Sequence, residues 1–281
     1  MSYDKIKSYA KINLALNVVG KKKFLHKIET IVAFISLHDE IFVRPIKSDS
    51  HKIFFTGEFS KKIGKINTIS MLIKILENKN LLKNKKFEIR VRKKIPVRAG
   101  LGGGSMNAAN IINYFIKKNI IKTTKKDLKL ITKLVGSDVI LGLNSTNTVY
   151  HSNDKISRFS KCKKFFVLIV KPSYGCSTKE IYSKVRKFDK PKFNRPNKEM
   201  FNFDYLKKMN NSLEPIVLSK YKKLRKVKSY LNSMSKCAFT RMTGSGSAIV
   251  AYFNSKKESE RAKQKFNKRY KNFWCIASKT I

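Results

Sequence analysis

Four glycines fall within five consecutive positions, at Gly100, Gly102, Gly103 and Gly104, and Ser105 follows them. Glycine lets the backbone approach a ligand closely, and the N–H groups at the start of a helix attract anions, so a glycine-rich segment before a helix is typical of a phosphate site. The segment does not match G-x-x-x-x-G-K-[ST], and it fails the dinucleotide pattern because Ser105 stands where the third glycine would fall. A phosphate cradle and a plain turn both remain open for this segment taken alone.

A second glycine cluster is Thr243-Gly244-Ser245-Gly246-Ser247, whose first glycine lies 140 residues after Gly104. It lies between two stretches with strand-like composition, and a hairpin turn would explain it in isolation. Two such clusters in one chain favour a ligand site over two unrelated turns.

Hydrophobic periodicity predicts the elements that must position these clusters. Alternating or compact apolar runs predict strands at residues 9–18, 28–34, 40–43, 52–56, 87–92, 148–151, 165–170, 239–242 and 247–253. Helical spacing predicts helices at residues 67–77, 106–116, 128–135, 213–231 and 256–266. Residues 187–200, with two prolines and dense charge, are expected to form a surface loop. A composition shift at residues 152–164 predicts two domains, 1–158 and 159–281.

Composition excludes a disordered chain and a small disulfide scaffold, since 281 residues with 42% hydrophobic and 11% aromatic content can bury a core. The net charge is +45, but the lysines are scattered and only 11 of the 63 cations are Arg, the residue preferred for bidentate phosphate and base recognition. The four cysteines show no C-x-x-C spacing, and no apolar run approaches the ~20 residues of a membrane span. We therefore expect a cytoplasmic protein that binds neither nucleic acid nor membrane.

Three motifs in order resemble those of the GHMP kinases, the superfamily of galactokinase, homoserine kinase, mevalonate kinase and phosphomevalonate kinase. They are Ala10-Lys11-Ile12-Asn13-Leu14, Pro96-x-x-Ala99-Gly100-Leu101-Gly102-Gly103-Gly104-Ser105-x-Asn107-Ala108-Ala109, and Met242-Thr243-Gly244-Ser245-Gly246-Ser247. Further segments narrow the resemblance to the 4-diphosphocytidyl-2-C-methyl-D-erythritol kinase family of the non-mevalonate isoprenoid pathway: Gly136-Ser137-Asp138-Val139, Pro172 with Ser177-Thr178-x-x-Ile181-Tyr182, and Asn211-x-Leu213-Glu214-Pro215.

The resemblance implies an α+β, two-lobed fold, with an N-terminal ribosomal-protein-like ATP-binding domain, a C-terminal α/β sandwich domain and the active site between them. It implies ATP-dependent phosphorylation of the 2-hydroxyl of a cytidine-diphosphate sugar alcohol. ATP is the expected phosphoryl donor and Mg²⁺ is expected with the nucleotide, while no protein metal ligand is predicted. A monomer or a homodimer is expected.

The resemblance also assigns residues. Lys11 and Asp138 are implied as the catalytic pair, since a carboxylate can accept the proton of the substrate hydroxyl while an ammonium lowers its pKa and steadies developing charge. The residues implied for ATP are Asn67, Lys93, Pro96, Val97, Arg98, Ala99, Gly100, Leu101, Gly102, Gly103, Gly104, Ser105 and Met106. Those implied for the acceptor are Asn13, His26, Tyr174, Thr178, Gly244 and Ser245.

This chain departs from the family at three of these positions. Leu25 replaces the aromatic residue usual before His26, so one face of the cytosine loses a stacking partner unless Phe24 substitutes, and Tyr174 is expected to stack on the other face. Met106 stands where a second serine is common, and Arg98 at a usually small position, although neither removes a backbone donor.

Two alternatives are kept. The first is an RNA- or ribosome-binding protein, suggested by the charge and the ribosomal-protein-like lobe but opposed by the scarcity of Arg and the lack of an RNP-type strand or GXXG clamp. The second is a GHMP kinase with another acceptor, such as mevalonate or homoserine, opposed by His26, Tyr174 and the run Gly102-Gly103-Gly104.

Overall fold

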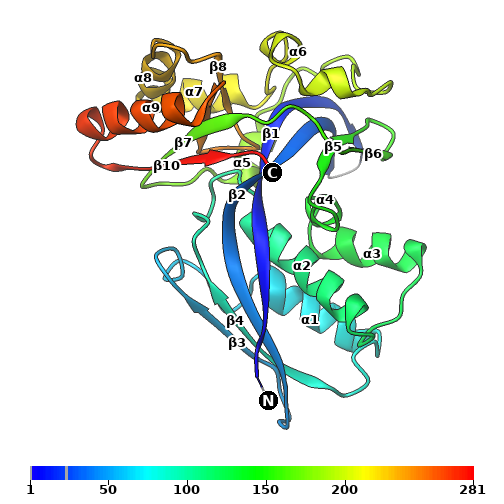
Figure 1. The fold of residues 1–281 in the computed structure, drawn as a ribbon. Coiled ribbons are helices and arrows are strands. Elements are labelled where there is room, and N and C mark those ends of the chain that lie inside the picture. Colours follow the sequence, from blue (N-terminus) through cyan, green and yellow to red (C-terminus); the bar gives the residue numbers. More distant parts are fainter. Residues whose placement is uncertain (1, 23–24) are drawn as a thin grey trace. The chain divides into compact units, whose positions relative to one another are not determined.

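The computed structural model describes residues 2–22 and 25–281 (Figure 1). The chain forms two compact units: unit 1 contains Met1–Ala10, Leu37–Val97 and Gly102–Ser145, and unit 2 contains Lys11–Ser36, Arg98–Leu101 and Thr146–Ile281. Each unit is assembled from three segments of the chain. The expected domains, residues 1–158 and 159–281, stay a prediction. Strands and helices are both abundant, which confirms the α+β class.

Two long strands, β1 (Asp4–Lys22) and β2 (Leu25–Ile46), contribute residues to both units. Sequence alternation predicts a polar face on β1, but residues 10–18 are buried on both faces. The polar side chains on that strand are satisfied inside the protein; the Asn17 amide, for example, donates to Glu29 Oε1 at 2.8 Å.

Unit 1 has a sheet covered by helices. Its remaining elements are β3 (Lys52–Thr56), α1 (Thr68–Asn78), β4 (Lys86–Arg92), α2 (Gly103–Lys117), α3 (Lys125–Val135) and α4 (Val139–Gly142). β4 pairs antiparallel with β2, Glu40 opposite Arg92, and parallel with β3. α1, α2 and α3 pack on one face of these strands (Figure 1).

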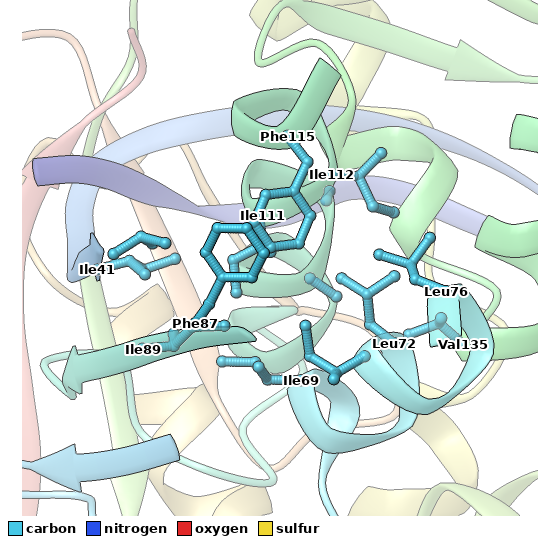
Figure 2. Close-up of a cluster of buried hydrophobic side chains, with 14 of the residues drawn as sticks. Ile41, Ile69, Leu72, Leu76, Phe87, Ile89, Ile111, Ile112, Phe115 and Val135 are labelled. Atoms are coloured by element: carbon cyan, nitrogen blue, oxygen red, sulfur yellow. The ribbon is translucent and has the colours of Figure 1, made fainter. Parts of the chain in front are cut away.

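The core of unit 1 follows from strand and helix periodicity. Alternate residues Phe87, Ile89 and Val91 of β4 point inward and meet the apolar stripe of α2. Figure 2 shows Phe87 and Ile89 against α2, with side chains of α1 and α3 closing the cluster; its labelled residues are Ile41, Ile69, Leu72, Leu76, Phe87, Ile89, Ile111, Ile112, Phe115 and Val135. The phenyl rings of Phe87 and Phe115 have centroids 4.8 Å apart.

Unit 2 contains an antiparallel sheet of order β10-β7-β9-β8. Its elements beyond β1 and β2 are β5 (Asn147–Tyr150), β6 (Ile156–Phe159), β7 (Phe166–Pro172), α5 (Thr178–Ser183), the 3₁₀ helix η1 (Lys198–Phe201), α6 (Phe203–Lys207), α7 (Glu214–Lys220), α8 (Lys222–Asn232), β8 (Phe239–Met242), β9 (Ile249–Phe253), α9 (Lys256–Arg269) and β10 (Phe273–Lys279). α8 and α9 lie along one face of the sheet (Figure 1) and bury Leu224, Val227 and Phe266 against it.

Several elements differ from the sequence prediction, and α4, α5, α6, η1 and β6 lie where no helix or strand was predicted. The strands expected at 28–34 and 40–43 are one strand, β2, because the intervening Asp39 is buried in it with partners of its own. The helix expected at 213–231 is interrupted at Tyr221, whose φ of −114° and ψ of 80° leave the helical region while the apolar spacing continues across it. β10 was not predicted. No helix within the described residues has the length and apolarity needed to cross a bilayer.

Candidate active site

The first glycine segment contains the start of a helix. α2 begins at Gly103, three residues earlier than predicted, and Gly102 at its N-cap has a φ of 69°, in the left-handed region that glycine tolerates. The first N–H groups of an α-helix have no intrahelical acceptor, and those of Gly103, Gly104 and Ser105 belong to residues that are exposed or partly exposed. This helix end can therefore hold an anion through backbone donors.

Packing explains why glycines occupy the first turn. A Cβ on Gly103 would lie 3.0 Å from Ile95 Cγ2 and 3.2 Å from Lys93 Nζ. A Cβ on Gly104 would lie 2.9 Å from Thr68 Oγ1, whose hydroxyl donates to Gly104 O at 2.9 Å. Lys93 and Ile95, which precede the glycine segment, and Thr68, at the start of α1, thus leave little room for a side chain on Gly103 or Gly104.

Asp138 belongs to the same unit as this turn and lies at the N-cap position of α4. Its side chain makes no capping hydrogen bond, so a plain capping role does not account for it. A Cβ on Gly136, two residues earlier, would be 3.7 Å from Ser105 Oγ, and a Cβ on Gly142 would be 2.8 Å from Ala109 Cβ. The segment that carries Asp138 therefore packs against the start of α2.

Asn67 and Lys93, implied for the adenine side, are engaged within unit 1. Asn67 is the N-cap of α1, and its Oδ1 accepts from the N–H groups of Ile69 and Ser70 at 3.0 and 3.1 Å. Lys93 is 3% exposed and its ammonium donates to the buried carboxylate of Asp39. Their role toward the nucleotide stays a prediction.

In unit 2 the second glycine cluster holds residues 98–101. Ala248 N donates to Ala99 O at 3.2 Å, and the Thr243 hydroxyl donates to Gly100 O at 3.0 Å. Gly100 has a φ of 75°, and a Cβ there would lie 2.0 Å from Thr243 O. A Cβ on Gly244 would lie 3.2 Å from the Gly100 Cα and carbonyl. Backbone-to-backbone contact therefore requires glycine at both positions.

We call the contacts between residues 243–248 and residues 98–101 the brace. Lys11 and Asn13 contact residues of this brace. The Lys11 ammonium donates to Asn13 Oδ1 at 2.6 Å, and Lys11 N donates to Leu101 O at 3.1 Å. Asn13 N donates to Thr243 Oγ1 at 3.0 Å, and its side-chain amide donates to Thr30 Oγ1 at 2.9 Å. Lys11 is only 2% exposed, so it is not one more solvated lysine of a basic surface.

Two of the other acceptor residues are in direct contact. The hydroxyls of Thr178, at the start of α5, and Ser245 are 2.9 Å apart. Tyr174 is placed differently from the expectation of a free stacking face: its ring stacks on Tyr221, with centroids 5.0 Å apart and 22° between the planes.

His26 has two aromatic neighbours to which the sequence analysis assigned no role. The imidazole centroid lies 5.1 Å from the Tyr182 ring and 6.5 Å from the Phe188 ring. Leu25 is 65% exposed, and Phe24 lies outside the described residues. Partial burial, followed by the nearby Lys21 charge, lowers the pKa of His26, which favours a neutral ring at pH 7.

Sequence reasoning missed Tyr182 and Asp39. Tyr182 belonged to a quoted motif, Ser177-Thr178-x-x-Ile181-Tyr182, so its aromatic ring was the available signal. Asp39 gave none, since its partners are 54 to 68 residues away in the chain. Within the described part of the chain, no group of three or more His, Cys, Asp or Glu is arranged to hold a metal ion.

Comparison with known proteins identifies the family of the chain. The GHMP kinase N-terminal domain family matches residues 67–149, and the GHMP kinase C-terminal family matches residues 186–272. A 4-diphosphocytidyl-2-C-methyl-D-erythritol kinase of Pelagibacter ubique is 54% identical over 281 residues, with 100% of both chains covered.

Solved structures share the fold. A crystal structure of a 4-(cytidine 5'-diphospho)-2C-methyl-D-erythritol kinase superposes with a TM-score of 0.77 at 21% identity, over 99% of this chain and 100% of that one. A homoserine kinase from Cytophaga hutchinsonii gives a TM-score of 0.69 at 15% identity, over 100% of this chain and 95% of that one. The full-length identity to the Pelagibacter protein decides between these relatives, and the chain belongs to the 4-diphosphocytidyl-2-C-methyl-D-erythritol kinase family of the GHMP kinases.

Proposed function

We propose that this protein transfers the γ-phosphoryl group of ATP to the 2-hydroxyl of 4-diphosphocytidyl-2-C-methyl-D-erythritol. The observation that carries the proposal is the 54% identity, over the whole of both chains, to a relative named for that reaction. The geometry within each unit is compatible with it, and phosphoryl transfer requires mainly positioning and charge stabilisation.

The nucleotide is assigned to the first turn of α2. The N–H groups of Gly103, Gly104 and Ser105 would hold phosphate oxygens at the positive end of the helix dipole. Mg²⁺ fits this donor set, because it binds chiefly to nucleotide phosphates with one or two protein oxygens, and the Ser105 hydroxyl lies in this turn. When bound, the ion would neutralise charge on the phosphates.

Asp138 is assigned as the base that accepts the acceptor's hydroxyl proton, and Lys11 as the cation that steadies developing charge. Asp138 is partly exposed, which a group that must reach a substrate requires. Asn13 holds the Lys11 ammonium in one place through the 2.6 Å hydrogen bond. Asp138→Asn should abolish phosphoryl transfer and leave ATP affinity within about twofold, because the carboxylate acts on the acceptor.

The cytosine end is assigned to His26, with Thr178, Gly244 and Ser245 toward the rest of the acceptor. We propose Tyr182 as a stacking partner for the base, since its ring lies 5.1 Å from His26, whereas the Tyr174 ring already stacks on Tyr221. Leu25→Tyr should tighten CDP binding, because base stacking on an aromatic ring contributes about 1–3 kcal/mol. Calorimetry with CDP that gives an unchanged or weaker affinity would count against this pocket.

Coupled ADP release tests the reaction itself. The wild-type protein is assayed with ATP, Mg²⁺ and one of three acceptors: the cytidyl methylerythritol, mevalonate or homoserine. We expect turnover with the first alone. Turnover with either of the others would overturn the acceptor, and wild-type turnover by Asp138→Asn would overturn the base. RNA binding is not favoured, because the full-length relatives are named as kinases.

A further inference from the structure

A buried carboxylate lies behind the glycine segment of unit 1 and has no role in the reaction proposed above. Asp39, in β2, is 0% exposed. Its Oδ1 accepts from the N–H groups of Lys94 and Ile95 at 2.8 and 2.9 Å. Its Oδ2 accepts from the Lys93 ammonium and from Asn107 Nδ2, the latter at 2.9 Å. Four donors therefore converge on one charged group, an arrangement in which each hydrogen bond is strengthened by the charge.

These donors come from both sides of the glycine segment. Lys93, Lys94 and Ile95 follow the end of β4, so they form the chain that enters the segment. Asn107 is the fifth residue of α2, so it belongs to the helix that leaves the segment. Asp39 thus links the residues that follow β4 to helix α2 through hydrogen bonds. The N–H of Lys93 in turn donates to Thr56 O of β3 at 2.7 Å.

The same residues support the first turn of α2 directly. Ile95 Cγ2 and Lys93 Nζ are the atoms that a Cβ on Gly103 would meet, at 3.0 and 3.2 Å. Gly103 therefore rests on two residues whose own positions are set by Asp39. A shift of the Lys93 ammonium or of Ile95 would move the turn whose amides are assigned to the phosphates.

The orientation of the Asn107 amide is set by Asp39. A carboxylate can only accept, so Nδ2 must face Asp39. Asn107 is only 2% exposed, so its Oδ1 is then left buried with no hydrogen-bond partner among the described residues. An apolar side chain would avoid that desolvation cost. The contribution of the amide at this position is therefore its hydrogen bond to Asp39.

We propose that Asp39 is a positioning residue for the nucleotide, which acts through Lys93 and Asn107 to fix the first turn of α2. The inference rests on the proposed function, because it takes that turn as the phosphate site. It also assigns Lys93 a supporting role, since its ammonium is bound to Asp39 and lies against Gly103.

Asp39→Asn cuts the network selectively. The Asn carbonyl oxygen can still accept from Lys94 N and Ile95 N, whereas its NH₂ group cannot accept from Lys93 Nζ. The Asn107 amide must turn over to present Oδ1 to that NH₂ group in place of Nδ2. Glu88→Gln is the matched control, because Glu88 is a 4% exposed carboxylate on β4 in the same unit and its ion pairs are with Arg44 and Arg90. Both changes remove one buried negative charge beside cations.

ATP binding is measured by calorimetry with Mg²⁺ and without acceptor, and turnover is measured with both substrates. We expect Asp39→Asn to weaken ATP binding about 10- to 100-fold, with a matching rise in the KM for ATP and an unchanged KM for the acceptor, because small displacements of a positioning element have effects of that size. Glu88→Gln should lower the melting temperature by less and leave ATP affinity within about twofold of wild type.

Exchanging the carboxylate of Asp39 and the amide of Asn107 tests whether ATP affinity can be restored. In Asp39→Asn with Asn107→Asp, an amide again faces a carboxylate and Lys93 again has an anionic neighbour, so ATP affinity should recover in part. Should Asp39→Asn not fold, Asn107→Ala takes its place, since it cuts only the link to α2, and the same selective rise in KM for ATP is expected.

The outcomes separate the two levels of inference. A wild-type protein that binds no ATP would overturn the proposed function. A wild-type protein that binds ATP, together with an Asp39→Asn variant that binds it as tightly as Glu88→Gln does, would overturn the role of Asp39 alone. An exchanged pair that is no better than Asp39→Asn would also overturn it.

Discussion

The two glycine clusters have similar sequences but opposite surroundings. In the first, Gly103 and Gly104 form the exposed or partly exposed first turn of α2, where backbone N–H groups have no acceptor within the helix. In the second, every residue from Thr243 to Ser247 is buried. Gly244 lies there against the backbone of Gly100, and the Ser247 hydroxyl donates to Tyr174 O at 2.9 Å.

This difference separates two uses of glycine. The first cluster leaves backbone N–H groups accessible, which suits an anion. The second allows two backbone segments to meet without side chains between them, and it thereby fixes residues 98–101, which lead directly into Gly102. We infer that the first cluster is the element that binds phosphate, and that the second also holds residues 98–101 in place, beyond the acceptor contacts assigned to Gly244 and Ser245. Substitutions should therefore separate ATP affinity from stability.

The largest effect is expected from Gly100→Ala. The new Cβ would lie 2.0 Å from Thr243 O, and the φ of 75° is strained for any L side chain. Neither backbone can move without breaking the contacts of the brace, so we expect a loss of about 4 kcal/mol or more in the free energy of unfolding. Thermal unfolding and soluble yield provide the measurement.

Gly20→Ala is the control for that substitution. Gly20 lies in β1 of the same unit, and a Cβ there would have only Lys27 Cβ within reach, at 3.9 Å. A Gly100→Ala protein as stable as Gly20→Ala would show that the brace yields easily, and the distinction between the clusters would fail.

A smaller loss of stability is expected from Thr243→Val. The change keeps the shape of the side chain but removes the hydroxyl that accepts from Asn13 N and donates to Gly100 O, each at 3.0 Å. The buried Asn13 N–H and the partly buried Gly100 carbonyl lose this partner, which should lower the unfolding free energy by about 2–4 kcal/mol. Chemical denaturation measures it, with Thr123→Val, at a partly exposed position, as a reference expected near zero. Equal midpoints for the two variants would contradict the brace.

Local patterns predicted much of the fold because they report one element at a time. The alternation of Phe87, Ile89 and Val91 located β4, and the apolar stripe after the glycines located α2. The start of α2 was placed too late because glycine has low helix propensity, so Gly103 and Gly104 resemble a loop until packing on Thr68 and Ile95 is known. The break at Tyr221 was invisible for the opposite reason, since apolar residues keep their spacing across it.

The candidate site was predictable only where a motif carried it. Lys11, Asn13 and Asp138 came from ordered motifs, whereas the Asp39 network depends on residues brought together from β2, β4 and α2. The buried state of Lys11 was likewise beyond the alternation pattern, which predicts a solvated face for it. Distances between segments far apart in the chain are set by packing, and no local pattern encodes them.

Gly104→Ala should change binding more than stability. Its Cβ would meet Thr68 Oγ1 at 2.9 Å, a side-chain atom at a partly exposed position that can rotate away, and alanine favours a helix over glycine. We expect a stability change within about 1 kcal/mol and roughly tenfold weaker ATP binding, since rotation of Thr68 breaks its hydrogen bond to Gly104 O and releases the turn that carries the amides. Calorimetry and thermal unfolding are compared on one preparation. Unchanged ATP affinity would remove the first cluster from the phosphate site.

The smallest effect concerns acid and is confined to the unit of the first cluster. Ion pairs hold the pKa of Glu40 at about 2, through Lys5 and Lys94, and hydrogen bonds from Tyr3 and Arg44 hold that of Glu88 at about 2. Both values lie below the ordinary 4.5, so each carboxylate stabilises the folded state above pH 4.5 and loses that contribution as the pH falls toward 2. Glu88→Gln should therefore melt below wild type at pH 7, with a gap that narrows as the pH is lowered. Melting curves at pH 7, 5, 4 and 3 test this, and a gap that stays constant would show that the charge of Glu88 contributes nothing to the stability of unit 1.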